Sequence, residues 1–210
     1  MLSFLHGAPS PEASPLPLFP LKTVLFPGGI LPLKVFEQRY IEMTKVCLRD
    51  DKPFGVCLLV KGPEVGAGLD ATPVEIASIG TMARITSWDM PQLGILHLKT
   101  EGSERFQLQA QAMADDGLVT GEVKPIAPER SLPLPDQYRP LADLLRILIE
   151  RVGSENFPPV HELDDASWVS YRLAEILPLP LNIKQTMLEV NDCEVRLEVL
   201  AKFLKQQDLL

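Results

Sequence analysis

The sequence predicts an α+β protein in which a β-rich lobe with one short helix is followed by a C-terminal helical bundle. The first observation is the placement of glycine, because all 13 glycines except Gly153 precede residue 122. Glycine supplies the positive φ angles of hairpins and bulges, which favours strands in this part of the chain. The second observation is that apolar residues recur at helical spacing chiefly after residue 135. We therefore expect a flexible lead-in over residues 1–15, a β-rich lobe over 16–127 and a helical bundle over 128–210.

The β-rich lobe begins with two extended segments joined by a turn. Residues 18–26 are apolar and extended in pattern, and the Pro27-Gly28-Gly29 sequence predicts the turn that follows. Pro20 and Pro32 have no N–H to donate to a sheet, so we expect them at edges or bulges. From residue 36 to residue 49 apolar side chains recur at helical spacing, which predicts the one helix of this lobe.

The rest of this lobe reads as strands separated by turns and by a polar, glycine-rich loop over residues 61–73. Gly80 predicts a bulge or bend within one strand. Residues 88–92 are expected to form a loop tip that carries Trp88 and Met90. These strands are expected at residues 54–60, 76–88, 95–98, 106–112 and 118–126.

A proline-rich linker over residues 125–135 precedes four helices with short connections, which is the pattern of a small bundle. Gly153 is expected to end the first of these helices, since glycine is favoured just after a helix. Short polar side chains that accept backbone hydrogen bonds mark the other helix starts. The expected N-caps are Asp164 or Asp165, Asn182 with Gln185 completing a capping box, and Asn191 or Asp192.

Charge and cysteine content exclude several classes of function. The formal net charge is −8, and neither half of the chain is basic, so nucleic-acid binding is not expected. No stretch free of charged residues approaches the 18 or so residues of a membrane span, and the first ten residues lack the basic start of a secretory signal. Three cysteines without CxxC spacing favour reduced thiols and a cytoplasmic location.

The sequence predicts no catalytic residue, no metal site and no cofactor. Phosphate-binding and nucleophile-elbow motifs are absent, and the histidines (His6, His97 and His161) form no metal-binding motif. Cys47 and Cys57 lie in apolar patterns that suit inert core thiols. Cys193 follows an expected helix cap and is the best candidate for a reactive thiol, although no base is evident to activate it.

Several segments, taken in order, resemble the Lon N-terminal domain family. Residues 18–40, LFPLKTVLFPGGILPLKVFEQRY, resemble its opening, including the helix start found in stand-alone and cereblon-like members. Further matches follow at residues 54–56, 79–85, 104–106 and 173–180. The matching positions include Pro20, Pro27, Gly28, Pro32, Phe36, Glu37, Arg39, Tyr40, Gly80, Arg105 and Phe106.

The resemblance implies a PUA-like, twisted β pseudo-barrel joined to the helical bundle. In full Lon proteases this region precedes ATPase and Ser-Lys protease modules, and a chain ending at Leu210 is expected to have neither activity. The leading hypothesis is therefore a non-catalytic module that binds proteins or unfolded polypeptide segments in proteolysis or protein quality control. The alternative is a small-molecule binder or enzyme that uses a cleft between the lobes, for which His97, a cysteine and acidic residues should line one deep pocket.

Most of the matching residues are expected to act structurally. Phe36 and Tyr40, one turn apart, are expected to plug one end of the barrel. Glu37 and Arg39 lie two residues apart, so they should not face each other on a helix, and we expect Arg105 to pair with Glu37 or with a backbone carbonyl. For a partner we expect Trp88 and Met90 to act as apolar anchors, the alternative being burial of Trp88 against the bundle.

Overall fold

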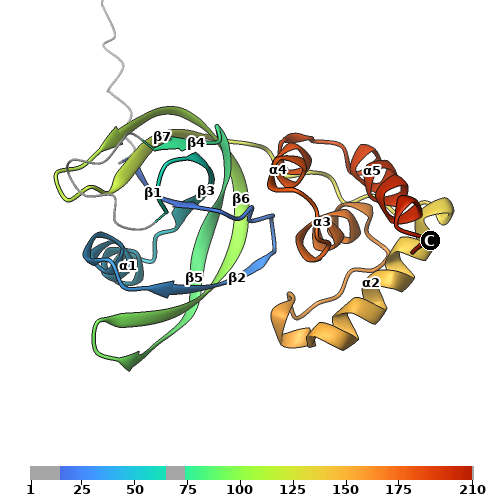
Figure 1. Cartoon of the computed structure of the whole chain (residues 1–210), viewed down its shortest axis with the longest axis horizontal. Helices are drawn as coiled ribbons and strands as arrows, with labels where there is room; N and C mark the ends of the chain where they lie inside the picture. Colours follow the sequence, from blue (N-terminus) through green and yellow to red (C-terminus); the bar gives the residue numbers. More distant parts are fainter. Residues whose placement is uncertain (1–14, 65–73, 210) are drawn as a thin grey trace, which may run out of the picture.

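The computed structural model describes residues 15–64 and 74–209, in which seven strands are followed by a group of helices (Figure 1). The strands are β1 (Leu16–Leu21), β2 (Ile30–Val35), β3 (Phe54–Lys61), β4 (Glu75–Ile76), β5 (Ile79–Gln92), β6 (Ile95–Met113) and β7 (Val119–Pro125). The helices are α1 (Gln38–Asp50), α2 (Arg139–Val152), α3 (Ala166–Ile176), α4 (Leu181–Glu189) and α5 (Cys193–Gln206), with 3-10 turns η1 (Asp136–Tyr138) and η2 (Ser154–Asn156). The predicted α+β class is confirmed. Nearly all of the expected flexible lead-in and most of the expected loop over 61–73 lie outside the described residues, and the two boundaries between the three expected regions stay predictions.

The strand pairings of the β-rich lobe form a closed ring. From β1 the pairing runs through β7, β6, β5 and β3, and β3 pairs with β1 again in parallel orientation. β2 is attached to β6 and β4 to β3. Pro32 therefore lies in a strand whose only described partner is β6, and Pro20 lies beyond Leu18, where pairing with β7 stops. Both prolines occupy positions where one side of the strand needs no backbone donor.

Helix α1 closes one end of this ring through its apolar face. Tyr40, Met43 and Cys47 recur at helical spacing and are buried, and the Tyr40 ring stacks on Phe19 with 4.0 Å between ring centroids. Phe36 precedes the helix and is 48% exposed. The expectation that Phe36 and Tyr40 both plug the barrel is therefore wrong for Phe36.

Glu37 and Arg39 contact each other, contrary to expectation. Arg39 Nη2 lies 3.0 Å from Glu37 Oε2, and Arg39 Nη1 donates to the carbonyl of Gly117 at 2.8 Å. The spacing rule fails because it applies inside a helix, whereas Glu37 is the N-cap and has extended backbone angles. The hydrogen bond from Arg39 to Gly117 ties the start of α1 to the β6–β7 turn.

The helix boundaries of the bundle follow local signals with one exception. Gly153, at φ +98°, ends α2, and the side chains of Asp165 and Asp192 accept backbone N–H groups at the starts of α3 and α5. The expected Asn182 capping box is wrong, because α4 starts after Pro180 and the carbonyl of Pro180 accepts its first hydrogen bonds. Gln185 instead donates to the carbonyl of Ile79 at 3.0 Å and so links α4 to β5.

The two lobes share a hydrophobic core. Phe26, fully buried, packs with the helical residues, and its ring centroid lies 5.4 Å from that of Tyr171. The turn after Phe26 is held from both sides. Gly28 N–H donates to the carbonyl of Gly102, Gly102 N–H donates to that of Gly29, and Arg172 donates to the carbonyl of Pro27 at 2.7 Å. The turn over residues 26–29 is thus a wedge between the lobes.

Candidate functional site

The β5–β6 hairpin carries the two apolar residues expected to contact a partner. Trp88 and Met90 lie within β5 and not in a loop tip, because the reversal occurs later, at Leu93 and Gly94, where Gly94 has φ +81°. Trp88 is 55% exposed and Met90 42% exposed, so the alternative of Trp88 burial against the bundle is wrong. β3 pairs with β5 only as far as Ala83. Among the described strands, residues 84–92 therefore pair with β6 alone and leave the other edge of β5 open.

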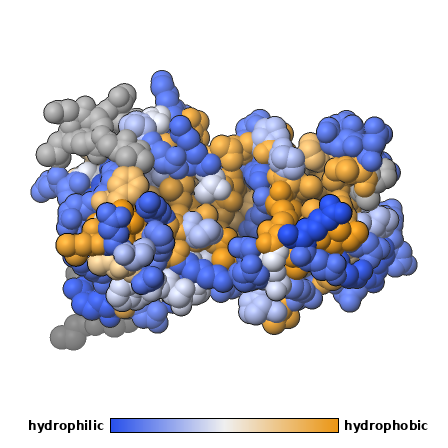
Figure 2. Space-filling view, turned by 60° about the horizontal axis from the view of Figure 1, so that its bottom comes forward, coloured by the Kyte–Doolittle hydropathy of each residue, from blue (hydrophilic) through white to orange (hydrophobic). Residues whose placement is uncertain are grey.

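A crevice between the two lobes is lined by residues of both. Its larger part has a volume of about 640 Å³ and lies between the sheet and the segment after α2. The β-lobe lining residues are Ile30, Thr86, Ser87, Lys99 and Glu101, and the helical-lobe lining residues are Ser154, Glu155, Phe157, Pro159 and His161. Lys99 Nζ crosses between the lobes and donates to the carbonyl of Glu155 at 2.9 Å. Figure 2 shows that hydrophobic patches interrupt the hydrophilic surface of both lobes.

A second hollow of about 250 Å³ also lies between the lobes. Its lining residues are Pro27, Ser103, Glu104, Arg105, Ile126, Pro128, Glu129, Ser131, Glu162, Asp165, Ser167, Trp168 and Tyr171. The rings of His161, in the larger hollow, and Trp168, in the smaller one, lie 6.0 Å apart. We call the two hollows together the interlobe crevice. Along β6 the two hollows lie on either side of Gly102, where the turn over residues 26–29 is hydrogen-bonded to the strand.

The interlobe crevice and the exposed Trp88 lie on opposite faces of the sheet, as the neighbouring residues Ser87 and Trp88 show. Ser87 lines the interlobe crevice, whereas Trp88 pairs with the buried Leu98 of β6 and so lies on the opposite face of the sheet. The exposed apolar pair of the hairpin is thus not part of the crevice.

A buried network of charges lies behind the smaller hollow. Both Nη atoms of Arg196 donate to Glu129, and the Tyr171 hydroxyl and Ser167 hydroxyl donate to the same carboxylate at 2.9 and 2.7 Å. Burial alone would raise the pKa of Glu129, but the hydrogen bonds of Arg196 and Ser167, the Arg196 charge and the Tyr171 hydrogen bond lower it overall. Burial raises the pKa of Tyr171 to about 12, so this phenol stays a donor at neutral pH. The network fastens the linker to α3 and α5.

Arg105 joins β6 to the same region. Its guanidinium donates to the carbonyls of Leu188 and Val190 and to Asn191 Oδ1, and it lies 3.8 Å from Glu129. The backbone-carbonyl alternative for Arg105 is therefore the one observed, and pairing with Glu37 is wrong. Phe106 lies on the opposite side of the strand and is fully buried. Gly80 of β5 is its paired residue. A side chain at position 80 would collide with the Phe106 ring and the Val56 carbonyl, so this position requires glycine.

Acid sensitivity is expected from Glu129. Its folded-state pKa is lowered, so folding stabilises the carboxylate; this contribution is present above the unfolded-state pKa of about 4.3 and is lost as the pH falls through the folded-state value. The free energy of unfolding should therefore drop as the pH is lowered from 5 to 3, and Glu129→Gln should flatten that slope. Urea titrations at constant ionic strength measure both. The exposed Glu122→Gln is the control, and an unchanged slope in Glu129→Gln would show that other carboxylates dominate acid unfolding.

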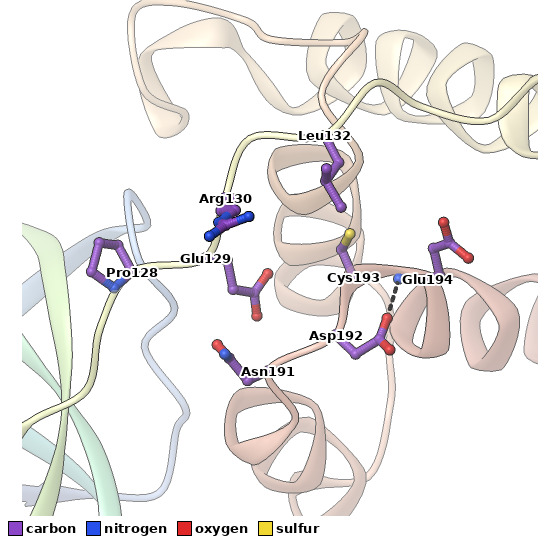
Figure 3. Close-up of a pocket in the computed structure, with 8 residues that line it drawn as sticks. All are labelled: Pro128, Glu129, Arg130, Leu132, Asn191, Asp192, Cys193 and Glu194. Carbon is purple, nitrogen blue, oxygen red and sulfur yellow. Dashed lines mark hydrogen bonds between the residues drawn. The ribbon is translucent and has the colours of Figure 1, made fainter.

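A further pocket contains the thiol that had the best case for reactivity. It has a volume of about 440 Å³ and is lined by Pro128, Glu129, Arg130, Leu132, Asn191, Asp192, Cys193 and Glu194 (Figure 3). The Cys193 side chain points toward Leu132 and is buried, and burial raises the pKa of the thiol. No histidine is among the residues that line this pocket, and the raised pKa disfavours the thiolate, which agrees with the expectation that no base is evident for Cys193.

The residue set expected for an enzyme is not brought together in these pockets. His97 is exposed on β6, where its neighbours on the adjacent strands are Asp89 and Lys34. It does not line the pocket that contains Cys193. Burial raises the pKa of Cys47 to about 11 and of Cys57 to about 12. Within residues 15–64 and 74–209, no three His, Cys, Asp or Glu side chains are placed to hold a metal ion, and no helix has the length and apolarity to cross a bilayer.

Comparison with known proteins shows which family and which solved structures this chain resembles. The family model of the ATP-dependent protease La (LON) substrate-binding domain matches residues 15–206. A Lon N-terminal domain protein from Xanthomonas campestris, solved by crystallography, is 36% identical with a TM-score of 0.71, covering 90% of this chain and 98% of that one. The N-terminal domain of a Mycobacterium avium complex Lon protease shares the fold at 19% identity and a TM-score of 0.63, covering 90% and 97% of the two chains.

Curated relatives extend the comparison to longer proteins. Lon protease 2 of Myxococcus xanthus is 24% identical over 199 residues, covering 91% of this chain and 24% of the relative. The Lon protease of Erwinia amylovora is 26% identical over 212 residues, covering 95% and 26% of the two chains. The chain thus spans about a quarter of the length of these relatives.

Proposed function

Because the chain belongs to the LON substrate-binding domain family, we propose that it binds extended segments of unfolded proteins in the interlobe crevice. The crevice itself is the observation that carries the proposal. Its two hollows have volumes of about 640 and 250 Å³, and apolar side chains from both lobes, among them Ile30, Phe157 and Trp168, line them. Hydrophobic burial of the segment's side chains would supply the affinity.

The proposed role is recognition without catalysis. The matched family is a substrate-binding domain, and the relatives in which this region occurs are named as proteases. We therefore propose that the chain presents bound segments to a proteolytic machine or to protein quality control. A cytoplasmic location is part of the proposal and is supported by the three cysteines, which are all free thiols.

Trp88 and Met90 are proposed as a second contact surface for the same partners. Both are exposed on a stretch of β5 that pairs with β6 alone among the described strands. An unpaired strand edge can accept an extended partner through backbone hydrogen bonds, with side chains such as Trp88 covering its apolar residues.

Filling the larger hollow of the crevice is expected to weaken binding strongly. Ser87 is exposed and lines the larger hollow, so Ser87→Trp should occupy the hollow without disturbing the core. Fluorescence anisotropy with a labelled, reduced and alkylated protein should show at least about tenfold weaker binding for Ser87→Trp. Trp88→Ala should weaken binding by roughly fivefold if the hairpin is the second contact.

Val60→Ala is the matched control, because Val60 is an exposed apolar residue at the end of β3, outside both surfaces. Thermal melts establish that each variant is folded. Undiminished binding by a folded Ser87→Trp variant would remove the crevice from the proposal, and undiminished binding by Trp88→Ala would remove the hairpin.

A further inference from the structure

Four carboxylates line the interlobe crevice and have no partner among the described residues. Glu101 and Glu104 belong to β6, and Glu155 and Glu162 belong to the facing segment of the helical lobe. Within the described part of the chain, none of these four side chains makes a hydrogen bond or an ion pair, in contrast to Glu129 on the same crevice. Acidic side chains therefore face the crevice from both lobes.

The cations near the crevice do not balance this charge. Lys99 donates to the Glu155 carbonyl, and Arg105 is occupied by backbone carbonyls and by Asn191. Arg172 is close enough to Glu101 for their charges to interact, but its guanidinium forms an ion pair with Glu175 at 2.9 Å. The crevice is thus acidic within a chain whose net charge is already −8.

Apolar surface alternates with these carboxylates. In the larger hollow, Ile30, Phe157 and Pro159 lie near Glu101 and Glu155, and in the smaller hollow Ile126 and Trp168 lie near Glu104 and Glu162. An extended segment directs successive side chains to opposite sides, so it can place apolar residues in the hollows and its other residues toward the carboxylates.

We infer that the interlobe crevice selects extended segments in which apolar residues are interspersed with lysine or arginine. This inference rests on the proposed function and specifies its substrate class. Basic side chains would meet one carboxylate from each lobe, and their aliphatic stems would cover apolar surface. Acidic segments would be repelled by the same four groups.

Three labelled peptides that share their apolar residues and differ only at the alternate positions test the inference. Those positions carry lysine and arginine, glutamine, or glutamate. By fluorescence anisotropy at low ionic strength, the basic peptide should bind about tenfold more tightly than the glutamine peptide, and the glutamate peptide should bind most weakly. The preference should shrink as salt is added, because exposed charges are screened.

A pair of variants assigns the preference to the crevice. Glu104→Gln/Glu162→Gln should reduce the preference for the basic peptide by roughly fivefold and leave binding of the glutamine peptide unchanged. Glu122→Gln/Glu150→Gln makes the same change in net charge at exposed positions outside the crevice and should leave the preference intact.

The outcomes separate this inference from the proposal beneath it. Equal affinity for the three peptides, or a preference that both double variants reduce alike, would overturn the inference and leave the crevice as a general peptide site. Failure of the folded protein to bind any of the peptides would overturn the proposed function as well.

Discussion

Replacing Arg196 with methionine is expected to lower the free energy of unfolding by about 3–5 kcal/mol, the cost typical of breaking a buried ion pair. Arg196 is 1% exposed, and its guanidinium satisfies both oxygens of the Glu129 carboxylate, whose side chain is 8% exposed. Methionine keeps much of the apolar stem but leaves Glu129 charged and poorly solvated. Urea unfolding at pH 7, followed by circular dichroism, measures the change.

The double variant Arg196→Met/Glu129→Gln separates charge from packing. Removing the orphaned charge should restore at least about 2 kcal/mol relative to Arg196→Met alone. Arg146→Met, which breaks an exposed ion pair with Asp143, is the control and should cost less than about 1 kcal/mol. A loss for Arg196→Met no larger than this control would show that the buried network contributes little to stability.

Gly102→Ala is expected to cost about 3 kcal/mol, although it adds a single methyl group. A Cβ at Gly102 would overlap the carbonyl oxygen of Phe26, a backbone atom that has little freedom to move. Phe26 is fully buried between the lobes, and Gly102 is hydrogen-bonded to Gly28 and Gly29 on the same turn. Relief of the overlap therefore requires the wedge between the lobes to shift. Thermal and urea unfolding measure the loss.

Gly94→Ala provides the comparison. Gly94 has φ +81° at the hairpin turn, and a Cβ there would meet no atom within 4 Å. Its cost should be about 1 kcal/mol, from backbone conformation alone. If the two alanine variants are equally stable, close approach of the backbone at Gly102 does not limit stability.

Features governed by neighbouring residues could be predicted from the sequence. The glycine distribution indicates where strands give way to helices, and Gly153, Asp165 and Asp192 act on backbone groups within their own turns. The expected Asn182 cap fails for a reason of the same kind, since Pro180 already starts the helix.

Features that depend on distant residues could not be predicted. Arg105 finds its acceptors 83 or more residues away, and the paired neighbours of Trp88 are set by the register between β5 and β6. The interlobe crevice brings together Pro27, Glu104 and Glu162, and no local pattern indicates that these segments meet. The overall negative charge of the sequence therefore gave no indication that acidic side chains gather at the crevice.

The closed ring of strands has a consequence for how the protein is made. β1 completes its pairing only when Leu16–Leu18 meet Val119–Gly121, which are synthesised about a hundred residues later, on the order of 5–20 s of translation. The packing of Phe26 is completed later still, because its partner Tyr171 belongs to α3. Until then the nascent chain exposes the apolar segment over residues 18–26. On the proposed function, the nascent chain therefore exposes an unfolded apolar segment of the kind that the finished protein binds, until its synthesis is complete.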